Sequence, residues 1–250
     1  FLLLDEMGPV NWPPGAAIGA PNHPHRGFET VTYLLKGRMN HADSAGNSGE
    51  LNPGSVQWMT AGSGVIHSEL PHPDFQKTGG VMHGFQIWVN LPAADKMMQP
   101  RYQDIPAENI PVVSSQDDLV EVRVIAGQSL GQSAVIDTMI PITVLHMILK
   151  PGGEIVQSID KGLNGMIYCF SGCLSVDEKT LNDGQLGILN DGDEVHLSVS
   201  ESAKEDVNIL FLAGPEINEP IARYGPFVMN TEQEIMQAYA DYNAGTLVKN

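Results

Sequence analysis

The sequence is poor in basic residues and in long apolar runs, and each shortage excludes a class of partner. It has 13 Lys and Arg residues against 30 Asp and Glu, a formal net charge of −17. We expect no direct nucleic-acid partner, because duplex affinity comes largely from Lys and Arg on phosphates. The longest apolar runs, such as 209–213, are far too short to span a bilayer, so no membrane partner is expected either.

Cysteine is also scarce. The two cysteines, Cys169 and Cys173, are fewer than a secreted disulfide scaffold of this size carries, and they cannot supply a four-thiolate zinc site. Reduced thiols in an acidic cytoplasmic protein are the expectation. The first residue is Phe1 rather than Met, so we expect the sequence to begin inside a longer chain.

Short strand-like runs dominate the rest of the sequence. They are rich in Val, Ile, Leu, Tyr and Trp, and turn residues bound most of them. Their spacing is typical of a β-sandwich or jelly roll rather than alternating βα units. The expected strands are 30–35, 55–59, 84–90, 119–125, 143–149, 165–170, 194–199 and 207–213.

One helix is predicted near the C-terminus. Thr231 and Glu234 have the spacing of a capping box, in which the N-cap hydroxyl and the third helical carboxylate satisfy each other's backbone N–H groups. Apolar residues at helical spacing follow, and Gly245 is the expected end.

The chain repeats itself weakly. Residues 26–37 align with residues 161–172 at an offset of 135, and the Pro-Gly turn before 55–59 resembles the Asp-Gly turn before 193–197 at an offset of 138. This pattern predicts two similar β units in tandem.

Two short histidine motifs in the first copy indicate a metal site. His23 and His25 flank Pro24, and in an extended segment residues i and i+2 point to the same face. His67 and Glu69 have the same spacing. Three imidazoles and one carboxylate, with positions left open, suit a catalytic site for Fe, Mn, Ni, Cu or Zn. Spacing alone leaves Glu29 as a rival to Glu69.

A longer pattern connects these motifs to a known family. His23-x-His25-x3-Glu29-x6-Gly37 matches the first cupin motif, and the stretch from Pro53 to His67 resembles the second. Several blocks spread over nearly the whole chain resemble the signature sequences of pirins. These blocks are residues 23–31, 57–62, 67–69, 82–91 and 225–230.

The resemblance implies an all-β bicupin, two tandem antiparallel β-barrels of the jelly-roll type with a short C-terminal helix. We expect a metal-binding barrel over residues 1–115 and a metal-free barrel with the helix over 116–250. The resemblance implies His23, His25, His67 and Glu69 as the ligands of one divalent ion, usually Fe(II). Glu29 is then a candidate to orient a ligand imidazole instead of binding the ion.

The second copy indicates one metal ion rather than two. At the repeat offset, Ser158, Asp160 and Asn164 replace His23, His25 and Glu29. His146 and His196 are isolated in the sequence, and isolated histidines are more often structural than ligating.

The resemblance implies two alternative functions. Some pirins resemble quercetinases, so the first hypothesis is a metal-dependent dioxygenase that opens a flavonol-like substrate with O₂. Glu69 would be the catalytic residue that takes the substrate proton. The expected pocket walls are Phe28, Met59, His83, Phe85 and Trp88. The second hypothesis is a metal- or redox-sensing regulator that binds a transcription factor or metabolic enzyme.

Overall fold

Short apolar runs bounded by turns give the chain an almost entirely antiparallel β structure. The computed structural model describes residues 1–248. They form two units, which we describe separately. The first contains residues 1–108 and the chain from Ile217 onward, and the second contains Asn109–Glu216. None of the described helices is both long and apolar enough to cross a membrane.

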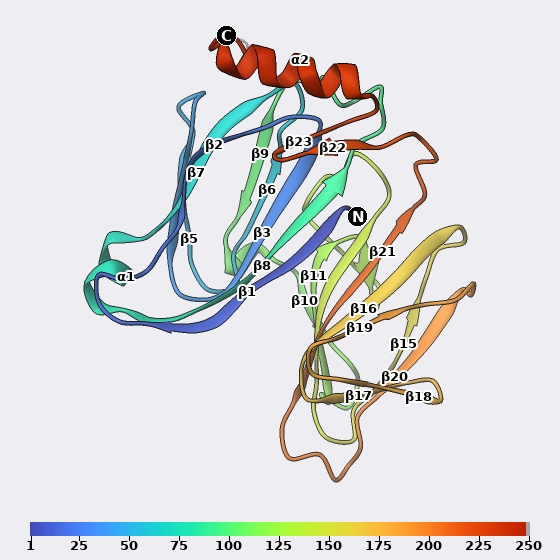
Figure 1. Ribbon diagram of the computed structural model, residues 1–250. Helices are drawn as coiled ribbons and strands as arrows, with labels where there is room; N and C mark the ends of the chain where they lie inside the picture. The colour runs from blue at the N-terminus through green and yellow to red at the C-terminus, as the bar shows by residue number, and fades with distance from the viewer. Residues whose placement is uncertain (249–250) are drawn as a thin grey trace. The chain divides into compact units, whose positions relative to one another are not determined.

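The first unit consists of two facing sheets (Figure 1). One has the order β1-β8-β3-β6-β9 and the other the order β2-β7-β4-β5. The bounds of the strands are β1 Leu3–Trp12, β2 Ala20–His25, β3 Phe28–Lys36, β4 Met39–Asp43, β5 Ser48–Leu51, β6 Val56–Thr60, β7 Val65–Pro71, β8 Gly80–Asn90 and β9 Arg101–Ile105. A short helix, α1 (Pro73–Thr78), lies between β7 and β8, and the 3₁₀ turn Ala107–Asn109 follows β9.

The second unit repeats this arrangement. Its sheets have the orders β10-β11-β14-β21-β16-β19 and β15-β20-β17-β18, with the separate hairpin β12-β13. The strands are β10 Val112–Ser114, β11 Val120–Ala126, β12 Gln128–Ser129, β13 Gln132–Ser133, β14 Thr143–Leu149, β15 Glu154–Ser158, β16 Leu163–Ser171, β17 Cys173–Val176, β18 Lys179–Asn182, β19 Gln185–Ile188, β20 Glu194–Ser198 and β21 Val207–Pro215. Inward side chains such as Leu145, Ile167 and Phe211 form one continuous apolar core.

The predicted repeat appears in the strand orders. The order β1-β8-β3-β6 corresponds to β14-β21-β16-β19, and β2-β7-β4-β5 corresponds to β15-β20-β17-β18. Strand β3 has a register shift against β8 between Leu34 and Lys36, and β16 has one against β21 between Cys169 and Ser171, at the same offset of 135. Gly37 and Gly172 then turn with φ of 95° and 90°. Both positions require the left-handed region that favours glycine.

The second part of the sequence alignment was wrong. Strand β20 pairs with β15 and β17, so it takes the place of β7 rather than of β6. Strand β19, which pairs with β16, takes the place of β6. The turn resemblance misled the alignment because a two-residue turn signal carries no information about which sheet the next strand joins.

The predicted C-terminal helix is α2 (Glu232–Asn243), which follows the hairpin of β22 (Ala222–Tyr224) and β23 (Phe227–Met229). Both hydrogen bonds of its capping box are present. The helix had been expected to belong to the second barrel, but it packs on the first unit. Its apolar side buries Ile235 and Ala238 with Phe227 and Met229, and Leu247 joins this cluster.

Every strand expected from the sequence is present, within a few residues at each end. The all-β fold with a C-terminal helix is therefore confirmed. Eight of the 23 strands in the described residues were expected; the others, among them the short strands β18 and β19, and the helix α1 were not.

Candidate metal centre

The two histidine motifs lie on neighbouring strands. Strand β2 carries His23 and His25 at the edge of its sheet, where Pro24 needs no ladder partner for its nitrogen. In the ladder between β2 and β7, His23 lies opposite His67. Directly paired residues share a face of the sheet, so the alternation of β2 and β7 brings the three imidazoles to one place.

The three rings form a tight cluster. The ring centroids are 4.4 Å apart for His23 and His67, 4.7 Å for His23 and His25, and 5.1 Å for His25 and His67. One ring nitrogen from each histidine lies within 4.8 Å of the others. Nitrogens bound to one first-row metal at about 2.1 Å lie about 3.0–3.4 Å apart at octahedral or tetrahedral angles, so coordination needs the three nitrogens to approach one another by at most about 2 Å.

Backbone carbonyls orient two of the rings. Nδ1 of His23 donates to the Pro21 carbonyl at 2.8 Å, and Nδ1 of His25 donates to the Pro226 carbonyl at 3.3 Å. Because Nδ1 then carries the proton, the lone pair of each ring is on Nε2. A carbonyl on the remote nitrogen is the usual support of a metal-binding imidazole.

His67 has no such support. It is buried, and neither of its ring nitrogens has a hydrogen-bond partner among the described residues. A buried imidazole with two unsatisfied nitrogens is costly, and a bound cation would satisfy one of them. The donor set therefore fits a divalent metal.

Burial keeps two of the imidazoles neutral. Burial, as the largest cause, and the neighbouring histidines together lower the pKa of His25 to about 3 and the pKa of His67 to about 2. The neutral imidazole is the form that binds metals. In this cluster, proton binding would place several like charges together in an interior of low dielectric.

Glu69 lies beside the cluster but its carboxylate is not among the atoms that converge within 4.8 Å. Its Oε1 accepts a hydrogen bond of 2.6 Å from Oγ1 of Thr32 on the opposite sheet. Burial raises the pKa of Glu69, while the bond from Thr32 and the nearness of His23 and His41 oppose that rise.

The rival carboxylate, Glu29, faces away from the histidines. Residues 28 and 32 of β3 share the inward face: Phe28 packs edge-on against His25 at 5.2 Å, and Thr32 bonds Glu69. Strand alternation places Glu29 on the other face, where its Oε1 accepts a hydrogen bond of 2.6 Å from Thr60.

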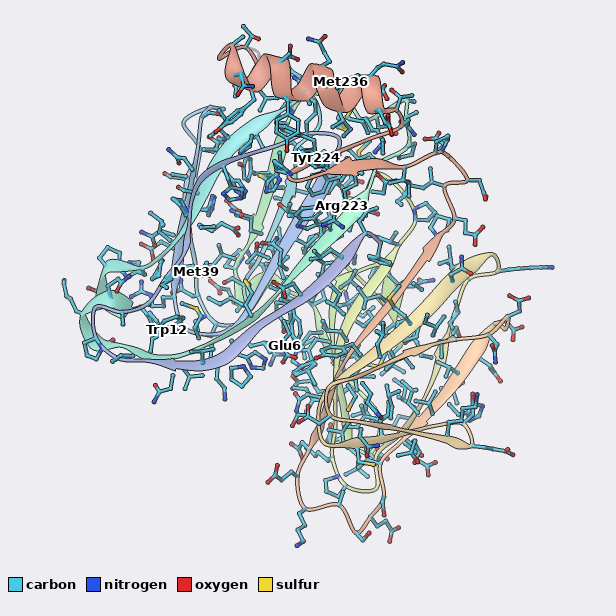
Figure 2. All side chains as sticks on the ribbon, in the orientation of Figure 1. Glu6, Trp12, Met39, Arg223, Tyr224 and Met236 are labelled. Carbon is cyan, nitrogen blue, oxygen red and sulfur yellow. The ribbon has the colours of Figure 1, made fainter. Side chains whose placement is uncertain are left out.

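Two of the five expected pocket-wall residues touch the cluster. Trp88 lies 5.6 Å from His25 and 4.4 Å from Phe28, measured between ring centroids. Arg223 of the β22–β23 hairpin places its guanidinium 4.5 Å from the Trp88 ring (Figure 2). His83 instead bonds Glu6 at 2.7 Å and contacts Phe85, so these two belong to a different part of the unit.

Two buried cations fix the backbone that follows His25. Arg26 donates to the Ser63 carbonyl at 2.7 Å and pairs with Asp241 of α2 at 2.7 Å. Lys96 donates to the carbonyls of Gly27 and Val228 at 2.8 and 3.2 Å, and burial lowers its pKa to about 8. The sequence gave no sign of this support, because the partners are separated by up to about two hundred residues.

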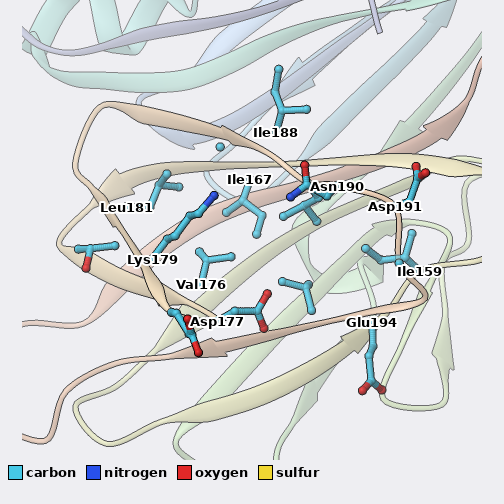
Figure 3. Close-up of a pocket in the computed structure, with 16 residues that line it drawn as sticks. Ile159, Ile167, Val176, Asp177, Lys179, Leu181, Ile188, Asn190, Asp191 and Glu194 are labelled. Carbon is cyan, nitrogen blue, oxygen red and sulfur yellow. The ribbon is translucent and has the colours of Figure 1, made fainter.

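The equivalent face of the second unit is chemically different. The inward side chains of β15 are Ile155 and Gln157, opposite Leu197 and Val195, whereas Ser158 is exposed. A pocket of about 550 Å³ opens in this unit (Figure 3). Apolar side chains including Ile159, Ile167, Val176, Leu181 and Val195 line it, with Asp177, Lys179 and Asp191 among its polar residues.

The two double-sheet units, the first with a histidine triad inside it, define a bicupin. The family model for pirin matches residues 1–89, and the model for the pirin C-terminal cupin domain matches residues 144–248. The chain belongs to the pirin family.

Its relatives span nearly the whole sequence. A pirin-like protein of Solanum lycopersicum is 42% identical over 98% of this chain and 80% of its own length. A Pseudomonas aeruginosa protein, provisionally named a quercetin 2,3-dioxygenase, is 41% identical over 100% of this chain and 86% of its own length. The crystal structure of a quercetin 2,3-dioxygenase from Acinetobacter baumannii superposes with a TM-score of 0.93 at 40% identity, covering 99% of this chain and 85% of that one.

Proposed function

We propose that His23, His25, His67 and Glu69 bind one divalent metal ion, with iron(II) as the first expectation and Mn, Ni, Cu or Zn as alternatives. The observation that carries the proposal is the convergence of three imidazole nitrogens within 4.8 Å. Glu69 is preferred to Glu29 because its carboxylate lies on the same side of the barrel as the triad. The orphaned nitrogens of His67 support the same ligand set.

We further propose that the metal-loaded protein is a dioxygenase of the quercetin 2,3-dioxygenase type, with a flavonol-like substrate and O₂. The names of the Pseudomonas and Acinetobacter relatives support this reaction class. A divalent ion held by these residues would supply Lewis-acid activation of the substrate hydroxyl.

The chain's own residues then have defined tasks. Glu69, at the edge of the triad, accepts the proton of the flavonol hydroxyl. Phe28 and Trp88 present aromatic surface beside His25, against which the planar substrate can stack. The guanidinium of Arg223 over Trp88 favours a substrate that has become anionic.

The test is to load the protein with iron(II), add quercetin under oxygen, and measure oxygen uptake and carbon monoxide release together. The proposal expects one carbon monoxide per oxygen consumed, and loss of both in His67→Ala. His196→Ala is the matched control, because this histidine is exposed and lies 3.6 Å from Glu194 in the second unit. An iron-loaded protein without turnover would refute the dioxygenase.

One observation favours a second candidate, a metal-dependent regulator that binds a protein partner. A net charge of −17 favours a partner with a basic surface over a polyanion. This candidate expects partner affinity to differ between the metal-loaded and metal-free chains in the absence of any turnover. Equal affinity in the two states would exclude it.

A further inference from the structure

A short hydrogen-bond relay leads to Glu69 from the sheet opposite. Nε2 of Gln86 donates to Oγ1 of Thr32 at 3.2 Å, and Thr32 donates to Oε1 of Glu69 at 2.6 Å. We propose that Thr32 and Gln86 are positioning residues that hold the Glu69 carboxylate toward the histidine triad. The inference rests on the proposed function, because it assigns a purpose to the proposed metal-binding carboxylate.

The chemistry of the three groups fixes the direction of the relay. A carboxylate that binds a cation is ionised and can only accept, so Thr32 must give its single hydroxyl proton to Oε1. The Thr32 oxygen is then left as an acceptor, and Gln86 must turn its amide N–H rather than its carbonyl toward it. With Oε1 engaged, Oε2 is the oxygen that remains for the metal.

The relay connects the two sheets of the first unit. Thr32 and Gln86 are directly paired on β3 and β8, so the ladder holds them side by side. Glu69 belongs to β7 of the other sheet. The bond from Thr32 therefore ties the end of a long side chain to the far wall of the barrel and restricts the rotamers that would swing the carboxylate away.

The second unit supplies an internal comparison. At the offset of 135, Ile167 takes the place of Thr32, and its ladder partner is Phe211 where Thr32 has Gln86. The register shifts that recur in β3 and β16 secure this correspondence. Ile167 and Phe211 are fully buried in the apolar core. The unit that lacks the triad thus has an apolar pair at these positions, and the unit that has the triad has the hydroxyl and the amide.

The experiment measures cobalt(II) binding by titration, and the visible spectrum of the bound cobalt, which changes with the number of its ligands. Thr32→Val removes the hydroxyl at nearly constant volume, and Thr32→Ser restores it. Thr30→Val is the matched control, because Thr30 is buried on the same face of β3 and no hydrogen bond joins it to Glu69 among the described residues.

We expect Thr32→Val to weaken cobalt binding by about 10- to 100-fold and to shift the spectrum toward that of Glu69→Gln. Gln86→Leu, at a half-buried position, should weaken binding in the same direction. Thr32→Ser and Thr30→Val should stay within about 3-fold of the parent protein. In a Glu69→Gln background, Thr32→Val should have almost no further effect, because Thr32 acts through Glu69.

Three different results would overturn the inference. If Glu69→Gln weakens cobalt binding but Thr32→Val and Gln86→Leu do not, the relay has no positioning role and the proposed metal site stands. If Glu69→Gln leaves both affinity and spectrum unchanged, the carboxylate is not a ligand, and the proposed ligand set fails together with the relay. Equal losses in Thr30→Val and Thr32→Val would indicate general damage to β3 and would also refute it.

Discussion

The ion pair between Arg26 and Asp241 should respond unequally to the removal of its two partners, because they are buried to different extents. The Arg26 side chain is 2% exposed and that of Asp241 is 23% exposed. Removing the carboxylate with Asp241→Ala leaves a buried guanidinium with the Ser63 carbonyl at 2.7 Å and the Leu247 carbonyl at 3.4 Å as its acceptors. We expect a loss of about 3 kcal/mol in the free energy of unfolding, the lower end of the range for breaking a buried pair.

The opposite substitution should cost less. Arg26→Met keeps the length of the side chain and removes the buried charge, and the half-buried Asp241 can turn to water. The remaining cost is that of two carbonyls without their donor, about 1–2 kcal/mol. The double variant should resemble Arg26→Met alone, because the uncompensated cation that makes Asp241→Ala costly is no longer present.

Tryptophan fluorescence during urea unfolding is the assay. Trp12, Trp58 and Trp88 all belong to the first unit, so the signal reports that unit. With a denaturant slope of about 2 kcal/mol per molar, a 3 kcal/mol loss lowers the midpoint by about 1.5 M. The reasoning is refuted if Arg26→Met costs as much as Asp241→Ala, or if the double variant loses the sum of the two.

Three further outcomes are expected. The metal-free protein should lose stability as the pH falls below 6.5, the ordinary pKa of histidine. The unfolded chain then binds protons at His25 and His67, whereas in the folded protein their pKa values of about 3 and about 2 keep both neutral. The slope is about 1.4 kcal/mol per pH unit for each histidine, and in urea titrations His67→Asn should reduce it by one such increment; an unchanged slope would contradict the neutral His67. Thr231→Ala removes the N-cap oxygen that accepts a hydrogen bond of 3.2 Å from the Glu234 N–H, and should lower the free energy of unfolding by about 1 kcal/mol in thermal unfolding. An unchanged stability would indicate that this end of the helix is frayed. Elemental analysis should find one metal ion per chain, and a value near two would contradict the assignment of a single site.

Local patterns predicted eight strands that lie largely in buried parts of the two units, although the buried strand β7 was not among them. The run 143–149 is strand β14 without correction, because its β-branched and apolar residues pack on both neighbours. Strands β18 and β19 escaped prediction because most of their side chains are exposed and need no apolar alternation. The capping box located α2, but no local signal could show that the helix packs on the first unit, since that depends on Arg26 and on the cluster around Phe227.

The sequence likewise predicted one part of the candidate site and missed another. Spacing at i and i+2 was enough to select His23, His25 and His67, because a strand places such pairs on one face. Spacing left Glu29 as a rival to Glu69, and the inward contacts of Phe28 and Thr32 show that Glu29 lies on the face of β3 away from the histidines. The carbonyl of Pro226, which orients His25, lies 201 residues away in the sequence and comes from a hairpin whose place only the folded chain reveals.

The first unit has a more polar interior than the second. Its polar side chains include Thr32, Gln86, His67 and Glu69, and burying such groups costs stability unless each has a hydrogen-bond partner. Thr32 and Gln86 are partnered by the relay, which leaves the nitrogens of His67 without a partner. The proposed ion would bind at His67, and its binding free energy would offset the cost of burying these polar groups. The second unit does not have this cost, because Ile167 and Phe211 are apolar. A cation bound there, as proposed, would satisfy a nitrogen of His67 that the described protein groups leave without a partner.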